Sequence, residues 1–152
     1  MILGIFNFIK TIAKIIKTDR GLKKGELALL PNDDVRTAVM SWMWGKFNRD
    51  WTNQYEVIQS LPKPCQDVYA CYTVVDEVNN GGFNQLFLNP TREFSQMAQK
   101  GFIAIGSEEL SGILGAAIEI YEKNKELLEK YNDGTIESFS KSYNEKLFDE
   151  LD

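Results

Sequence analysis

Apolar residues recur at three- and four-residue spacing through most of this sequence, and that periodicity restricts the fold more than any other feature. Such spacing gathers the apolar side chains on one face of a helix. The pattern is clearest over residues 107–131, where one face carries Leu110, Ile113, Leu114, Ala117, Ile120, Tyr121, Leu128 and Tyr131. No segment shows the alternation typical of a strand. The sequence therefore predicts an all-α fold, a single-domain multi-helix bundle.

Caps and turns divide this pattern into separate helices. Ser107 stands before Glu108 and Glu109, an order that favours a helix start because the helix dipole attracts anions there. Runs of Asn, Asp and Gly tolerate the left-handed backbone that a helix stop requires. Further helices are predicted to begin near Asn32 and to span about 52–60, 66–79, 91–105 and 136–150. The Trp and Met residues near 40–51 are expected in the core, with a sticky binding surface as the alternative.

The first 24 residues differ in charge from the rest of the chain. They hold six basic side chains and one acidic one, with isoleucines at helical spacing. We expect an amphipathic arm over residues 1–25 and a helical domain over 26–152. The arm would pack on the body or on a second subunit, or would lie on an anionic membrane. Its expected membrane or dimer contacts are Ile5, Ile9, Ile12, Ile16, Lys10, Lys14 and Lys17.

The residue types that usually perform catalysis are scarce. The sequence has no histidine, which removes the commonest general base and metal ligand. Asp76 and Glu77 are adjacent and would point about 100° apart on a helix, a poor geometry for a carboxylate pair. No phosphate-binding glycine loop or nucleophile motif occurs. We therefore expect no enzyme, no catalytic residue, no metal and no cofactor.

The sequence also indicates a cytoplasmic protein. No run of apolar residues is long enough to span a bilayer. The apolar start has no basic region before it and no small-residue cleavage site after it, so we do not interpret it as a secretory signal. Cys65 and Cys71 are expected to be reduced thiols.

Acidic residues dominate after the first 24 positions. That part of the chain carries 21 acidic and 11 basic side chains, a net charge of −10, which argues against direct nucleic-acid binding. On an ideal helix, four glutamates of the 107–131 segment fall within about 80° of one another. They are Glu119, Glu122, Glu126 and Glu129. This face is either a solvated surface with Lys123 and Lys130 as ion-pair partners or a surface that imitates a phosphate backbone.

The segment Asp76-Glu-Val-Asn-Asn-Gly-Gly-Phe-Asn-Gln-Leu-Phe-Leu-Asn89 resembles a bacterial domain family, one member of which is a DNA-mimic protein. The resemblance covers roughly residues 35–130. It implies an all-helical fold, often dimeric, and an acidic surface that occupies the DNA site of a DNA-binding protein. The residues of the motif are Glu77, Asn80, Gly81, Gly82, Phe83, Gln85 and Asn89. They would form a structural loop between helices or, alternatively, a pocket or partner surface.

Together these features favour a non-catalytic domain that binds a protein partner through an acidic face, and the resemblance implies that this face acts as a DNA mimic. The sequence leaves two alternatives open: an antidote or immunity-type protein that neutralises a toxin, and a membrane-surface adaptor anchored by residues 1–17. An amide-rich ligand pocket around Asn80, Gln85 and Asn89 is a fourth hypothesis.

Overall fold

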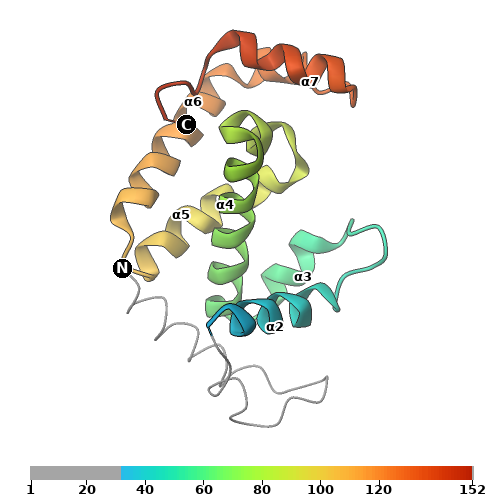
Figure 1. The fold of residues 1–152 in the computed structure, drawn as a ribbon, viewed down its shortest axis with the longest axis vertical. Coiled ribbons are helices and arrows are strands. Elements are labelled where there is room, and N and C mark those ends of the chain that lie inside the picture. Colours follow the sequence, from blue (N-terminus) through green and yellow to red (C-terminus); the bar gives the residue numbers. More distant parts are fainter. Residues whose placement is uncertain (1–31, 152) are drawn as a thin grey trace. The chain divides into compact units, whose positions relative to one another are not determined.

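The computed structural model describes residues 32–151, and this part of the chain contains six α-helices and no strand (Figure 1). The expectation of an all-α fold is therefore confirmed. The α-helices are α2 (Asn32–Trp44), α3 (Gln54–Ser60), α4 (Lys63–Leu88), α5 (Ser95–Ala104), α6 (Glu108–Glu129) and α7 (Ile136–Ser142). Two short 3-10 helices, η2 (Pro90–Phe94) and η3 (Tyr143–Glu145), complete the set. The predicted arm at 1–25 and its boundary at residue 26 lie outside the described residues.

The chain divides into two compact units, Met1–Tyr69 and Ala70–Asp152, and the long helix α4 crosses the division. The first unit contains α2, α3 and the start of α4. Apolar side chains from all three helices are buried there because each helix presents one apolar face. These buried residues are Val35, Val39, Met40, Met43, Ile58, Cys65 and Val68.

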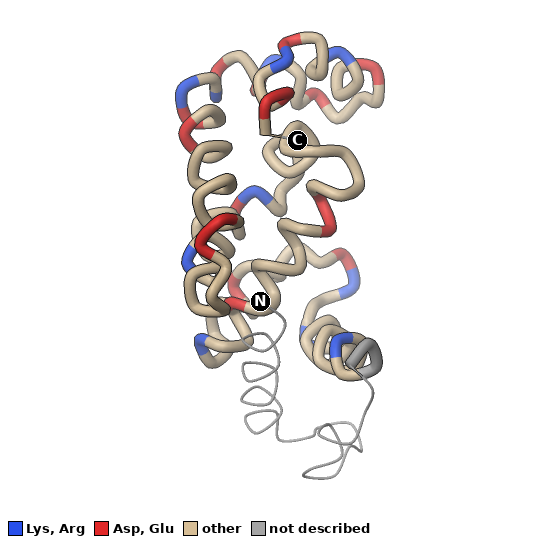
Figure 2. Tube along the Cα trace, turned by 60° about the vertical axis from the view of Figure 1, so that its left-hand side comes forward, with Lys and Arg blue, Asp and Glu red and all other residues tan. Residues whose placement is uncertain are grey.

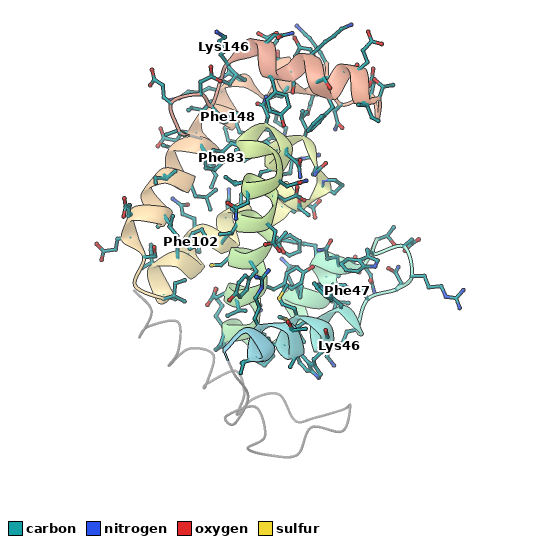
Figure 3. The ribbon with its side chains drawn as sticks, viewed as in Figure 1. Lys46, Phe47, Phe83, Phe102, Lys146 and Phe148 are labelled. Atoms are coloured by element: carbon teal, nitrogen blue, oxygen red, sulfur yellow. The ribbon has the colours of Figure 1, made fainter. Side chains whose placement is uncertain are left out.

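The core of the second unit is built around aromatic rings. Phe87 stacks on Tyr121 with ring centroids 4.6 Å apart, and it also stacks on Phe148 at 5.4 Å. The ring centroid of Phe83 lies 5.9 Å from that of Phe148, and Figure 3 labels both side chains. All three phenylalanines are almost fully buried. The rings join α4, α6 and the C-terminal turn into one core. Phe83 and Phe87 are therefore core residues.

Helices α5 and α6 pack against each other and are joined by a short turn. Gly106 in this turn has a φ of 79°, a left-handed conformation that glycine adopts without strain. A methyl group at Gly115 would lie 2.5 Å from Nε2 of Gln99, so α6 approaches α5 closely at this point. Ser107 stands at the N-cap position as predicted, but its side chain makes no capping hydrogen bond.

The helix predicted over 66–79 is interrupted at Gly81 and Gly82, whose backbone is non-helical, and a second helical stretch then runs to Leu88 as part of α4. One helix boundary near the C-terminus is wrong in detail. The last helix ends at Ser142 rather than near residue 150, because the chain turns through η3 and Lys146 takes a left-handed φ of 53°. Phe148 is thereby buried, whereas Ile136 at the start of α7 is 84% exposed.

Candidate protein-binding face and motif loop

The four glutamates of the predicted acidic face all lie on α6, and all four are exposed. Glu119 forms an ion pair with Lys123 at 3.7 Å, in which both side chains are 74% exposed. A pair so open to solvent contributes little to stability, because water screens it. Both side chains are therefore free to exchange this contact for one with a partner.

A kink at Asn124 divides this face. Asn124 has a non-helical backbone (φ −118°, ψ 15°), and its side-chain Nδ2 donates to the Ile120 carbonyl at 2.8 Å. In a regular helix that carbonyl would accept from the backbone N–H of residue 124. Insertion of a side chain into the hydrogen-bond ladder is an established cause of helix kinks. The glutamates therefore form two pairs, 119/122 and 126/129, rather than the one regular stripe of an ideal helix.

Lysines are interleaved with these carboxylates. Lys123, Lys125 and Lys130 are exposed on the same stretch of chain. Figure 2 shows basic and acidic positions close together near the end of α6 and along α7. The face is thus anionic at the two glutamate pairs but is not uniformly charged.

Two side chains of the motif, Gln85 and Asn89, bind the carboxylate of Glu77 on α4. Its Oε2 accepts hydrogen bonds from Nε2 of Gln85 at 2.8 Å and from Nδ2 of Asn89 at 2.9 Å. Its Oε1 accepts from the Thr91 hydroxyl at 2.7 Å. Three side chains that follow the kink in the sequence therefore donate hydrogen bonds to one carboxylate that precedes it. This geometry favours the interpretation of the motif as a structural element over its interpretation as a pocket.

The two glycines of the motif have different roles. Gly82 adopts φ 67° and ψ −171°, a region that is essentially restricted to glycine. At Gly81 a methyl group would lie 2.4 Å from Oε1 of Gln85 and 2.9 Å from the Tyr143 hydroxyl. The Tyr143 hydroxyl donates to the Gly81 carbonyl at 2.7 Å. The backbone conformation thus requires glycine at position 82, whereas a methyl group at position 81 would press on the side chains of Gln85 and Tyr143.

The motif does not draw every residue into one cluster. Asn80 is exposed, whereas Asn84, which was not singled out in the sequence, is buried. Nδ2 of Asn84 donates to Oγ of Ser142 at 3.4 Å, and its Oδ1 has no partner. Sequence reasoning also missed Thr91 and Tyr143, because both lie outside the motif and have no local signal.

Residues 59–152 match the family described as DMP19-like protein. This match covers more than half of the chain. The chain belongs to the DMP19-like family. The resemblance drawn from the motif is therefore confirmed, although the matched region begins and ends later than residues 35–130. No curated protein and no solved structure gives a significant match.

The DMP19-like region contains both the motif loop and the glutamates of α6, whereas α2 and the loop that follows it lie outside the region. The fold of the second unit and the features that support a binding role thus come from the same part of the sequence. Within residues 32–151 no helix is long and apolar enough to cross a membrane.

The perturbed carboxyl groups of the DMP19-like chain belong to turns, not to the acidic face. The pKa of Asp133 is lowered by hydrogen bonds from Ser138 and Thr135, which fix the start of α7. The pKa of Asp50 is lowered in the same way by Thr52. In the described part of the chain, no group of three or more His, Cys, Asp or Glu side chains is placed to hold a metal ion.

Proposed function

We propose that this DMP19-like chain binds another protein, without catalysis, through the exposed glutamates of α6, and that this face occupies the DNA-binding site of its partner. The observation that carries the proposal is the exposure of Glu119, Glu122, Glu126 and Glu129 on a single helix of the family region. Exposed carboxylates present fixed negative charge to a basic surface, which is the electrostatic property that a DNA-binding site recognises.

The charge of the second unit supports this proposal. Residues 70–152 carry 15 acidic and 7 basic side chains, a net charge of −8. The rise of about 1.5 Å per residue places successive glutamates of each pair about 4.5 Å apart along the axis. The kink at Asn124 then sets the direction of the second pair relative to the first. A partner with separated basic groups would contact both pairs.

The test uses the tagged full-length chain and a pool of lysate proteins that bind duplex DNA. We expect a partner from this pool to be retained at low salt and released by added duplex DNA, because both ligands would compete for one site. Changing the four α6 glutamates to glutamine should weaken retention at least about tenfold, which corresponds to about 1.4 kcal/mol.

A matched variant controls for net charge. Glu56→Gln, Glu93→Gln, Asp149→Asn and Glu150→Gln remove the same number of exposed carboxylates elsewhere, and this variant should retain the partner. Equal loss in both variants would show that only overall charge matters and would refute a specific face. A partner that duplex DNA does not displace would refute mimicry and favour a toxin-neutralising role.

A further inference from the structure

All three tryptophans of the chain lie within ten residues, at the end of α2 and in the loop that follows. Trp44 and Trp51 are 42% and 45% exposed, so the expectation that they are core residues is wrong. Their ring centroids are 6.1 Å apart, and the ring centroid of Phe47 lies 5.3 Å from that of Trp51. We call residues 44–53, which carry these three rings, the aromatic loop.

The aromatic loop is held in shape by its own hydrogen bonds. The backbone N–H of Asn48 donates to Oδ1 of Asn53 at 2.9 Å, and Nδ2 of Asn48 donates to the Thr52 hydroxyl at 2.8 Å. Trp51 is held at a φ of 62°, which is uncommon for a bulky residue. A loop that is already ordered loses less conformational entropy when it binds a partner. The aromatic loop is therefore suited to bind as a preformed surface.

The aromatic loop also carries positive charge. Its basic residues are Lys46, whose Nζ lies 4.3 Å from the ring centroid of Trp42, and Arg49, which is exposed (Figure 3 labels Lys46). Its one acidic residue, Asp50, accepts hydrogen bonds from the backbone N–H and the hydroxyl of Thr52. The loop thus combines exposed apolar rings with a net charge of +1.

A second exposed apolar patch lies where α5 turns into α6. Ile103, near the end of α5, is 58% exposed, and Leu110, in the first turn of α6, is 40% exposed. Glu108 and Glu109 are exposed beside them. This stretch contains no basic residue and has a net charge of −2. We call residues 103–110 the acidic turn.

The aromatic loop and the acidic turn are complementary in two properties. Each patch exposes large apolar side chains, which gain free energy when they leave water together. The two patches carry opposite charges, and opposite charges on facing surfaces fix the orientation of a contact and suppress wrong ones. A second copy of the chain therefore offers each patch a surface that matches it in both polarity and charge.

We propose that the aromatic loop of one copy packs on the acidic turn of a second copy. Most homo-oligomers close with two-fold symmetry, so we expect a dimer in which each loop meets the turn of the other copy. The two patches together have fewer residues than the roughly 20–30 that each partner contributes to a standard interface, so the association should be in the micromolar range. The aromatic loop lies outside the DMP19-like region, residues 59–152, and the contact does not follow from the family match.

This contact is separate from the glutamates of the proposed function. Glu119, the first of them, lies nine residues after Leu110, which is about 14 Å further along the helix axis. The dimer contact and its test therefore require no DNA-binding partner. Failure of either proposal leaves the other unaffected.

Concentration dependence tests the proposal on the full-length chain. Over the micromolar range, sedimentation velocity should show a shift from monomer to dimer. Tryptophan emission should shift to the blue over the same range, because the exposed indole rings leave water. All of this emission comes from residues 42–51, so the shift reports on the aromatic loop.

A double variant tests the two exposed rings. Trp44→Ala with Trp51→Asn should raise the dissociation constant of the dimer at least about tenfold, because buried tryptophans carry a large share of interface energy. Asparagine is chosen at position 51 because it tolerates a left-handed backbone. As a control, Ile136→Ala removes an exposed apolar side chain outside both patches and should leave the dissociation constant unchanged.

A charge exchange tests whether the loop and the turn meet. Arg49→Glu reverses the charge of the loop, and Glu108→Lys with Glu109→Lys reverses that of the turn. Each variant alone should associate at least about tenfold more weakly, because like charges would face each other. An equimolar mixture of the two variants should associate as tightly as the native chain, because every loop then meets a turn of opposite charge.

Two controls accompany the charge exchange. Glu122→Gln with Glu126→Gln alters charge elsewhere on α6 and should leave the association unchanged. Circular dichroism should show that every variant remains helical, which separates loss of contact from loss of fold.

Three results would overturn the proposal. Dimer formation without a shift in emission would place the contact elsewhere on the chain. A mixture of the charge variants that associates no better than either variant alone would show that the loop and the turn do not meet. A chain that stays monomeric would have no such contact, and a shift in its emission with oligothymidine or with phosphatidylglycerol vesicles would assign the loop to nucleic acid or to lipid.

Discussion

The hydroxyl of Tyr143 donates a hydrogen bond to the carbonyl of Gly81, at 2.7 Å, and so joins the C-terminal turn to the kink of α4. The two residues are 62 positions apart in the sequence. Gly81 lies within the motif that carries the family resemblance, and Tyr143 lies well beyond it. The contact shows that the motif loop is completed by a distant segment.

Loss of this hydroxyl should destabilise the fold modestly. We expect Tyr143→Phe to lower the free energy of unfolding by about 1 kcal/mol, because the phenylalanine ring keeps the packing but leaves the carbonyl without its donor. Urea denaturation measures the change. Ile136→Ala, at a side chain that is 84% exposed, should change stability by less than about 0.5 kcal/mol. Equal effects of the two substitutions would contradict a specific role for the hydroxyl.

Gly82 should not tolerate a side chain. We expect Gly82→Ala to cost roughly 1–3 kcal/mol, because an alanine cannot adopt φ 67° and ψ −171° without strain. Gly112 provides the opposite control: it lies inside α6, is exposed and has no atom within 4 Å of an added methyl group. Gly112→Ala should therefore stabilise the chain by about 0.5–1 kcal/mol. Thermal or urea unfolding of both variants checks the contrast in sign.

The carboxylate of Glu77 should be needed for stability rather than for partner binding. Glu77→Ala removes the common acceptor of Gln85, Asn89 and Thr91, and we expect a loss of about 2 kcal/mol. Glu93→Ala, at an exposed residue of η2, should be close to neutral. A stable Glu77→Ala protein that loses its partner would instead support the pocket or partner-surface interpretation of the motif.

The buried thiol of Cys65 should make the fold sensitive to alkaline pH. Burial raises the pKa of Cys65 to about 11, against an opposing effect of the Lys46 charge, while an unfolded thiol ionises near 9.0. Because the folded state holds this proton more tightly, the stabilisation is complete below pH 9 and is lost as the pH rises towards 11. Cys65→Ala should lose less stability than the native chain when urea unfolding is compared at pH 8 and pH 10.5. Identical losses would show that the thiol makes no contribution.

Much of the helical pattern was predictable because it depends on residues close together in the sequence. The apolar face of α6 and the stop near Gly134 follow from spacing and from the conformational freedom of glycine and its neighbours. The distribution of charge and the absence of histidine can likewise be read from the sequence without a structure. The motif itself was enough to identify the family.

The end of the last helix was not predictable in the same way. Phe139, Tyr143 and Leu147 repeat every four residues and predict a helix through residue 147. The chain instead leaves the helix after Ser142, and Phe148 reaches the rings of Phe83 and Phe87. Burial of an aromatic ring against distant partners outweighs a few local helical hydrogen bonds.

The sequence alone determined the helical class, the position of the motif, the uneven distribution of charge and the family. The tertiary structure decided which polar groups meet at Glu77, that Asn124 divides the acidic face and that Trp44 and Trp51 face solvent. The physical reason is the distance along the sequence between the residues that interact. Helical periodicity and glycine turns are set by neighbours a few residues apart, whereas burial and the choice of hydrogen-bond partner depend on which distant segments fold against one another.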